Sequence, residues 1–205
     1  MRLLVFDTET TNKPPLVALT PTTIDQWPYM VQFSFVLIDT DTYKYTEYDY
    51  VIQCKVQIEN DFIHGITTSM NKTIGYSFSS IYPIFEECIK QADLLIGHNI
   101  EFDINMIRAE CFRNHILWRC DKPFYCTMKS TTRLCALPRF KWPTLKELHS
   151  HLFQETPSNL HNSMIDVWTC LRCYLKVMHN IDIIEKKKKI RLILNPVTDV
   201  CKIEL

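Results

Sequence analysis

In the first quarter of this chain, apolar runs and an alternation of apolar and polar residues are typical of β-strands. An apolar run at residues 3–6 opens the chain, a second run covers Met30–Ile38, and aromatic residues alternate with polar ones over Tyr43–Ile52. The sequence Asp39-Thr40-Asp41 is typical of a turn. These segments predict an antiparallel meander of three strands, and the proline-bearing polar stretch at 12–27 predicts a loop.

Helical spacing begins at residue 80, where apolar side chains recur three and four positions apart up to residue 91. The short apolar segment Asp93–Gly97 then predicts a buried strand, and Asn99 is a suitable N-cap for a helix over Ile100–Asn114. A strand, a crossover helix and a second strand imply parallel pairing.

The remaining pattern predicts one more strand and two more helices. Phe124–Met128 has the composition of a short strand, and Thr144–Phe153 predicts a helix in which Thr144 is the N-cap and Glu147 completes a capping box. A long helix follows and ends near His179. The pattern therefore predicts an α/β protein whose sheet mixes antiparallel and parallel strands.

Composition indicates one domain with an appendage, because the chain has 205 residues, of which 46% are hydrophobic and 22% charged. Lys+Arg and Asp+Glu both number 23, so contact with a polyanion must depend on a local basic patch or on bound metal. Three glycines are too few for a glycine-rich phosphate loop or a dinucleotide-binding fold.

Nine cysteines, the absence of a signal-peptide pattern and the absence of a long apolar run all bear on the compartment. We expect a soluble protein of an intracellular, reducing compartment that does not span a membrane. Cys170 and Cys173 fall within a helical pattern and lack a second Cys-x-x-Cys, so we interpret them as core thiols rather than zinc ligands.

Two carboxylates follow the first apolar run at positions i and i+2. In a strand, Asp7 and Glu9 point to the same face. Desolvated carboxylates are costly unless a cation compensates them, and oxygen ligands suit Mg²⁺ or Mn²⁺ better than zinc. The alternative is that Asp7 ends the strand and Glu9 lies in a solvated turn. A metal site therefore requires further ligand residues elsewhere in the chain.

Three more residues could complete such a site. Asp103 lies one turn after a predicted parallel strand, where open sheets place ligands, although a carboxylate there can also merely stabilise the helix dipole. We expect the apolar residues on either side of Asp103 to be core positions. His161 precedes Asp166 by five positions at the start of the last helix. The alternative is that Ser163-x-x-Asp166 is only a capping box.

Together these residues resemble the motifs of the DEDD-type 3′-to-5′ exonucleases, specifically the histidine subclass (DEDDh) related to polymerase proofreading subunits (DnaQ-like). The first motif, Asp-x-Glu, matches Asp7-Thr8-Glu9, and the second, a carboxylate shortly after His-Asn, matches Asp103. The third motif, His-x4-Asp, matches His161 and Asp166. The tyrosine subclass carries Tyr-x3-Asp instead.

The resemblance covers about residues 1–180, which we interpret as the exonuclease domain, and leaves 181–205 as a C-terminal basic and apolar extension. The run Lys186–Lys189 could be a solvated helix end, a phosphate-contacting tail or a docking segment for a protein partner. A minor family feature, His-Gly-Ile-Thr, matches residues 64–67. Family members commonly have glycine where this chain has Asn12, and we expect the same positive-φ turn because asparagine tolerates it.

The resemblance implies an RNase H-like fold, a mixed five-stranded sheet flanked by α-helices. It also implies hydrolysis of the terminal phosphodiester at a single-stranded or frayed 3′ end of DNA or RNA, with release of nucleoside 5′-monophosphates. Two divalent cations, Mg²⁺ or Mn²⁺, would be bridged by Asp7, with Glu9 and Asp166 completing one site and Asp103 serving the other. His161 would be the general base.

Substrate contacts are expected from residues beside these motifs. They are Thr8, Thr10, His64, Ile66, Asn99 and Phe102. Of these, His64, Ile66 and Phe102 could wedge or stack the last bases, and stacking tolerates any sequence. A DNA substrate, in proofreading, repair or end trimming, is slightly favoured, and an RNA-degrading or RNA-trimming exoribonuclease is the alternative. These motifs do not separate the two, because the residues that sense a 2′-OH cannot be identified from them. A catalytically silent nucleic-acid-binding module is the alternative of another class, and the intact set of chemical residues argues against it.

Overall fold

A five-stranded mixed sheet forms the centre of the fold, in a computed structural model that describes residues 1–158 and 160–185. The strands lie in the order β3-β2-β1-β4-β5. Their bounds are β1 (Arg2–Thr10), β2 (Met30–Asp39), β3 (Tyr45–Val51), β4 (Leu94–Gly97) and β5 (Phe124–Cys126). β2 pairs antiparallel with β1 and β3, whereas β4 pairs parallel with β1 and β5. The predicted meander and the predicted parallel strands are both confirmed.

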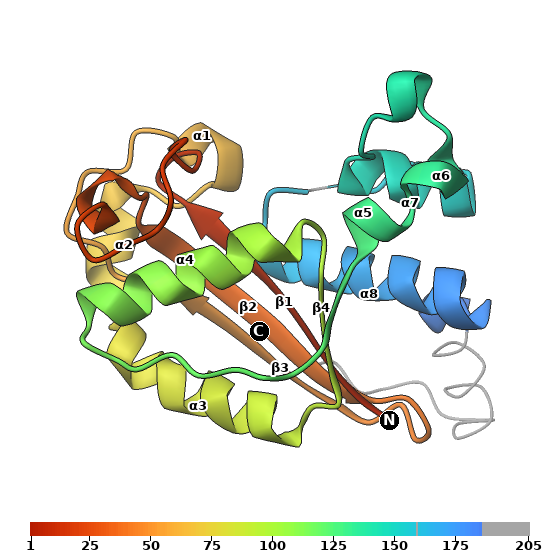
Figure 1. Cartoon of the computed structure of the whole chain (residues 1–205), viewed down its shortest axis with the longest axis horizontal. Coiled ribbons are helices and arrows are strands. Elements are labelled where there is room, and N and C mark those ends of the chain that lie inside the picture. The colour runs from red at the N-terminus through yellow and green to blue at the C-terminus, as the bar shows by residue number, and fades with distance from the viewer. Residues whose placement is uncertain (159, 186–205) are drawn as a thin grey trace, which may run out of the picture.

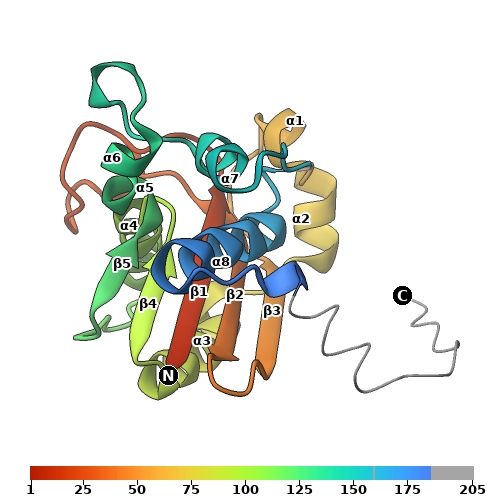
Figure 2. The same ribbon diagram turned by 90° about the vertical axis from the view of Figure 1, so that its right-hand side faces the viewer.

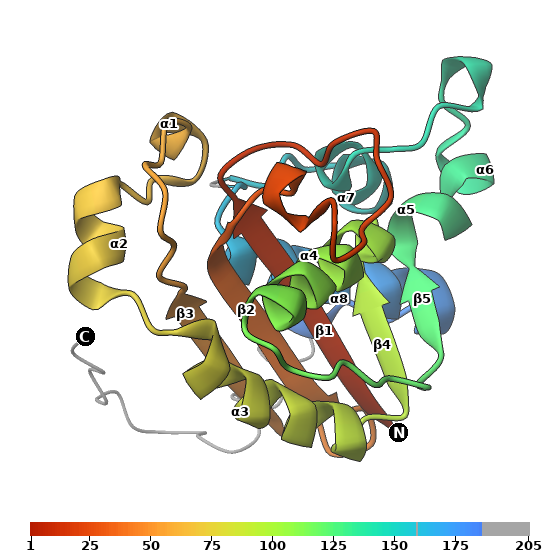
Figure 3. The same cartoon turned by 60° about the vertical axis from the view of Figure 1, so that its left-hand side comes forward.

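Helices cover both faces of the sheet. α3 and α4 lie on one face (Figures 1 and 3), and α8 crosses the other face in front of β1 and β2 (Figure 2). The helices are α1 (Asp61–His64), α2 (Thr68–Ile74), α3 (Phe78–Gln91), α4 (Ile100–Arg113), α5 (Thr127–Ser130), α6 (Thr132–Cys135), α7 (Leu145–Phe153) and α8 (Ser163–His179). Two 3₁₀ turns, η1 (Ile24–Gln26) and η2 (Pro138–Phe140), lie in connections. The sequence pattern predicted α3, α4, α7 and α8 but none of the short helices.

The alternation of β1 sorts its side chains between two cores. Leu4 and Phe6 belong to the core under α3 and α4, whereas Leu3 and Val5 belong to the core under α8. Phe85 of α3 meets Phe6 edge-on, with ring centroids 5.4 Å apart. Burying such a ring contributes about 1.5–3 kcal/mol. Since the alternation continues along the strand, the polar residues that follow are also divided between the two faces.

The start of α4 differs in detail from the prediction. Asn99 is the residue before the helix, as predicted, but it adopts a left-handed conformation (φ 69°) and its side chain makes no capping hydrogen bond. Phe102 and Ile104 are only partly buried, whereas Asp103 between them is 2% exposed. The expectation that Phe102 and Ile104 are core positions holds only in part, because both pack against the core under α3 and α4 without being fully buried. The residue that α4 buries at this point is Asp103, on the face turned toward the end of the sheet.

The turn after β1 also differs from the prediction. Asn12 does not have a positive φ. Its side-chain Oδ1 instead accepts a hydrogen bond from the backbone N–H of Lys13 at 2.8 Å, and its carbonyl accepts one from the Thr10 hydroxyl at 2.7 Å. These two hydrogen bonds shape the turn without the conformation that a glycine would supply.

The last described residues pack against α8. Ile183 is buried in the α8 core, and Asp182 pairs with Arg172 at 2.7 Å. The run Lys186–Lys189 lies outside the described residues, so the boundary after residue 180 and the role of the extension remain predictions. Cys170 and Cys173 are buried free thiols. Among the helices described here, we find none with the length and apolarity needed to span a membrane.

Candidate active site

Two carboxylates at the end of β1 face α8. Asp7 and Glu9 continue the side of the strand that carries Leu3 and Val5, so they point toward the start of α8 once the apolar run ends. Asp166 lies in the first turn of α8 and meets them there. Burial and the neighbouring charges of Asp166 and Asp103 raise the pKa of Glu9 from 4.5 to about 8.

Asp103 approaches from the opposite layer. It lies in the first turn of α4, and its Oδ1 accepts hydrogen bonds from the backbone N–H and the hydroxyl of Thr8 at 3.0 and 2.8 Å. Burial raises the pKa of Asp103 to about 7, although the two hydrogen bonds from Thr8 oppose the shift. Thr8 therefore fixes the Asp103 carboxylate to the strand that carries the other two.

The four carboxylates lie close enough to affect one another's ionisation. Burial raises the pKa of Asp7 well above its ordinary value, and the charges of Asp103, Asp166 and Glu9 raise it further. Asp166 has a pKa raised to about 6, again chiefly by burial. Groups this close titrate together rather than singly. The raised pKa values show that the ionised carboxylates are unfavourable here, and a bound divalent cation would relieve their repulsion.

One oxygen of this site has no hydrogen-bond partner among the residues that the structure describes. Asp166 Oδ1 is buried and unpaired, while Oδ2 accepts the backbone N–H of His161 at 3.2 Å. His161 itself is exposed and has a positive φ of 72°, a conformation that costs a non-glycine residue about 1–3 kcal/mol. Potential ligand atoms of Glu9, His161 and Asp166 all lie within 4.8 Å of one another. An unpaired buried carboxylate oxygen in such a group fits a cation ligand.

The start of α8 decides against the capping-box interpretation of Asp166. Asn162, not Ser163, is the N-cap, and its side chain accepts the Ile165 N–H at 3.3 Å. Ser163 instead donates its hydroxyl to the Asp7 carbonyl at 2.8 Å. The helix is thus capped without Asp166.

A polar network that the sequence did not suggest holds this helix start against the sheet. The backbone N–H of Ser163 donates to Gln32 Oε1 at 3.2 Å, and Gln32 Nε2 donates to Asp49 at 2.8 Å. Gln32 of β2 is the direct cross-strand partner of Glu9 on β1. The only sequence signal was a polar pair, Gln32 and Ser34, within an otherwise apolar strand, and both side chains bond to Asp49.

The predicted substrate contacts lie around this site in different settings. Thr8 and Thr10 are buried, with their hydroxyls bonded to Asp103 and to the Asn12 carbonyl. Asn99 and Phe102 are partly exposed at the start of α4.

His64 and Ile66 are 7% and 5% exposed, so neither presents a surface for a base in this conformation. Asn60 connects α1 to the end of β1. Its Nδ2 donates to the Thr10 carbonyl at 2.9 Å, and its Oδ1 lies 3.4 Å from His64 Nε2. Phe62, which also lies in α1, is 83% exposed.

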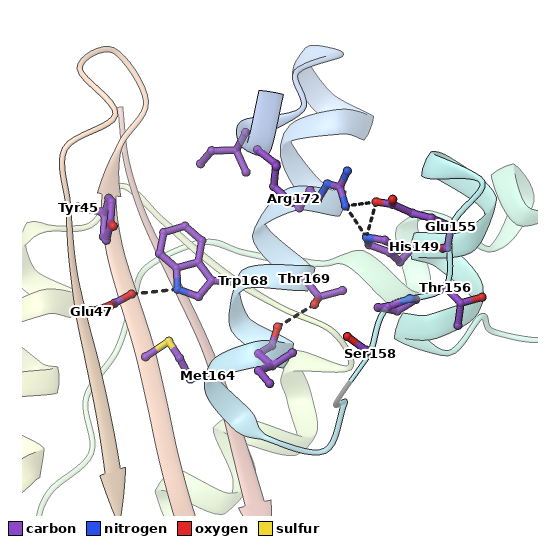
Figure 4. Close-up of a pocket in the computed structure, with 14 residues that line it drawn as sticks. Tyr45, Glu47, His149, Glu155, Thr156, Ser158, Met164, Trp168, Thr169 and Arg172 are labelled. Atoms are coloured by element: carbon purple, nitrogen blue, oxygen red, sulfur yellow. Dashed lines mark hydrogen bonds and ion pairs between the residues drawn. The ribbon is translucent and has the colours of Figure 1, made fainter. Parts of the chain in front are cut away.

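A separate pocket of about 660 Å³ lies on the outer side of α8 and contains none of the five motif residues. Figure 4 shows Arg172 at its edge, in contact with His149 and Glu155. The same guanidinium pairs with Asp182. These contacts join α7, α8 and the residues after α8, so we interpret the cluster as structural.

The chain matches a family model described as Exonuclease (RNase T) over residues 4–174. It therefore belongs to this exonuclease family, which consists of nuclease hydrolases. Comparison with curated proteins gives no match.

Solved structures show the same fold. One is the nuclease domain of 3'hExo, described as a DEDDh family member bound to rAMP, with 14% identity and a TM-score of 0.67 over 88% of this chain and 93% of that chain. Another is a full-length 3'-exonuclease, with 16% identity and a TM-score of 0.66 over 87% of this chain and 60% of that chain. The predicted exonuclease family and the predicted mixed five-stranded sheet flanked by helices are confirmed.

Proposed function

We propose that this chain is a metal-dependent 3′-to-5′ exonuclease that removes nucleoside 5′-monophosphates one at a time from a nucleic-acid strand. The observation that carries the proposal is the convergence of four carboxylates from β1, α4 and α8, of which Asp166 keeps one buried oxygen unpaired. Four acidic groups in one place destabilise a fold unless cations bind them, so the arrangement supports a role in chemistry.

The donor set fits two divalent cations, Mg²⁺ or Mn²⁺, because all four carboxylates supply oxygen ligands. Asp7, Glu9, Asp103 and Asp166 would hold them. When bound, such cations neutralise the carboxylates, activate water as a nucleophile and stabilise the departing 3′ oxygen.

The residues of the chain supply the remaining steps. His161, exposed beside Glu9 and Asp166, accepts the proton of the attacking water as the general base. Thr8 keeps Asp103 in position, and Ser163 ties the Asp7 backbone to α8.

The terminal nucleotide is proposed to lie over the start of α4, where Asn99 and Phe102 are partly exposed and Thr8 and Thr10 line the end of β1. Stacking by His64 or Ile66 requires α1 and the residues that follow it to move, since both side chains are buried.

The test is digestion of matched 5′-labelled DNA and RNA strands with Mg²⁺, with Mn²⁺, and with a chelator. We expect a ladder shortened from the 3′ end, nucleoside 5′-monophosphates as products, and no cleavage in the chelator. Faster loss of the DNA strand is expected, and faster loss of the RNA strand would identify an exoribonuclease. Binding without cleavage under every metal condition would contradict the proposal and support a silent nucleic-acid-binding module.

A further inference from the structure

A basic and aromatic protrusion stands beside the start of α4. Residues 127–143, here called the 127–143 protrusion, comprise α5, α6 and η2, and Figures 1 and 3 show α6 and the following turn projecting beyond the sheet. The protrusion is anchored at both ends. At one end Thr127 Oγ1 donates to the Gly97 carbonyl at 3.2 Å, and at the other His98 Nε2 donates to the Pro143 carbonyl at 3.0 Å.

These anchors place the protrusion next to the proposed active site, because Gly97 ends β4 and His98 lies in the short link to α4, which carries Asp103. A salt bridge between Lys129 and Glu101 joins α5 to the first turn of α4. A strand whose 3′ end reached the four carboxylates would therefore pass close to this part of the surface.

The charge of the protrusion differs from that of the chain. Residues 127–143 contain four cationic side chains and no aspartate or glutamate, whereas the whole chain has net charge zero. Lys129 and Lys141 have carboxylate partners, Glu101 and Glu147. Arg133 and Arg139 are exposed, and their side chains have no ion pair or hydrogen bond with any described residue. Two guanidinium groups are thus available to an anion.

Aromatic rings lie among these cations. Phe140 is 74% exposed and Trp142 is 56% exposed, and both line a surface pocket of about 710 Å³ together with Lys129, Ser130, Thr132 and Arg133. Arg139 and Phe140 both have positive φ, at 61° and 53°, so strained backbone holds the exposed tip of the turn. Exposed large rings beside unpaired cations are the combination with which proteins bind single-stranded nucleic acid.

We propose that the 127–143 protrusion binds the single-stranded segment of the substrate strand on the 5′ side of the scissile bond. Bases stack on Phe140 and Trp142, and Arg133 and Arg139 contact the phosphates. The inference rests on the proposed exonuclease function and specifies where a longer substrate gains affinity. An apolar patch for a protein partner would not require unpaired cations within it.

The test compares a substrate too short to reach the protrusion with one that can. The short substrate is the p-nitrophenyl ester of thymidine 5′-monophosphate, and the long one is a 5′-labelled single strand of about 20 nucleotides. The variants are Phe140→Ala with Trp142→Ala, and Arg133→Gln with Arg139→Gln. Lys72→Gln on α2, an exposed cation away from the protrusion, is the matched control.

We expect kcat/KM on the long strand to fall about 5- to 150-fold for each stacking ring removed, with hydrolysis of the ester unchanged. In the variant that replaces both arginines, the slope of log affinity against log salt should become shallower by about 0.7 for each phosphate that is no longer neutralised. Equal kcat/KM of the parent protein and both double variants on the long strand would overturn the inference. A parent protein that cleaves neither substrate would instead contradict the proposed function, so the two failures are distinct.

Discussion

Replacing Glu9 by glutamine should stabilise the metal-free protein by an amount that grows with pH. In the fold, burial and the charges of Asp166 and Asp103 raise the pKa of Glu9 to about 8 from 4.5. Between these two pH values the folded state binds more protons than the unfolded state. The contribution of Glu9 to the free energy of unfolding therefore falls as pH rises from 4.5 to 8. Glutamine has nearly the same shape and no charge, so in the variant this residue does not lower the free energy of unfolding as pH rises.

The magnitude follows from the size of the shift. A pKa change from 4.5 to about 8 corresponds to an upper limit of about 5 kcal/mol, at about 1.36 kcal/mol per unit. Glu9 is only partly buried, so solvent screening and local relaxation reduce this value. We expect the variant to be more stable by about 2–4 kcal/mol at pH 9 and by less than about 1 kcal/mol at pH 5. In a chain of this length, the larger difference raises Tm by about 4–16 °C.

Thermal unfolding followed by circular dichroism in a chelator, at pH 5, 7 and 9, measures this difference. Glu59→Gln is the control, because Glu59 is exposed and outside the site, and its Tm should match that of the parent at each pH. Adding Mg²⁺ should raise the Tm of the parent more than that of Glu9→Gln, since a ligand stabilises only the state that binds it. A difference in Tm between parent and variant that stays constant from pH 5 to pH 9 would refute the reasoning.

Four further predictions concern neighbouring residues. Asp7→Ala should abolish strand digestion while raising the Tm of the metal-free protein, because it removes the carboxylate that the other three repel; a variant that still digests the strand would exclude Asp7 as a metal ligand. His161→Ala should lower kcat about 10²- to 10⁴-fold at saturating metal and substrate while strand affinity is retained, and unchanged kcat would remove His161 from the mechanism. Thr8→Val should raise the pKa of Asp103 by removing one hydrogen bond, so the acid limb of a pH–rate profile should move to higher pH; an unmoved limb would show that ionisation of Asp103 does not limit the rate. Ser163→Ala should lower the free energy of unfolding by about 0.5–1.5 kcal/mol, measured by urea denaturation, and no loss would mean that its bond to the Asp7 carbonyl contributes nothing.

The sequence predicted the parts of the fold that depend on local periodicity. Alternation in β1 placed Asp7 and Glu9 on one face, and the apolar spacing of α3 predicted the crossover that makes β4 parallel to β1. Local spacing could not reveal the short helices α1, α5 and α6, because four-residue helices are stabilised by their surroundings rather than by a repeating pattern.

Contacts between distant segments account for most of what the sequence missed. Ser163 and Asp7 are 156 positions apart, and Thr8 and Asp103 are 95 apart, so no motif could pair them. The motif also named His64 and Ile66 without showing that the fold buries them. Ile66 is buried by packing against Val31, Cys54 and Ile58, and Asn60 bonds this region to Thr10 of β1. Spacing along the sequence does not encode such contacts.

Hydrogen bonding is distributed unequally over the carboxylates, and this inequality bears on how the site would bind cations. Thr8 donates two hydrogen bonds to one oxygen of Asp103, whereas one buried oxygen of Asp166 has no partner within the described part of the chain. A fully bonded set of carboxylates would make the metal-free fold more stable, but hydrogen bonds would have to break before each cation could bind. The observed arrangement fixes the orientation of one ligand and leaves a lone pair open on another. The carboxylate repulsion in the metal-free state arises at the end of β1, whereas the two cores on either side of the sheet are built of apolar residues whose burial opposes it.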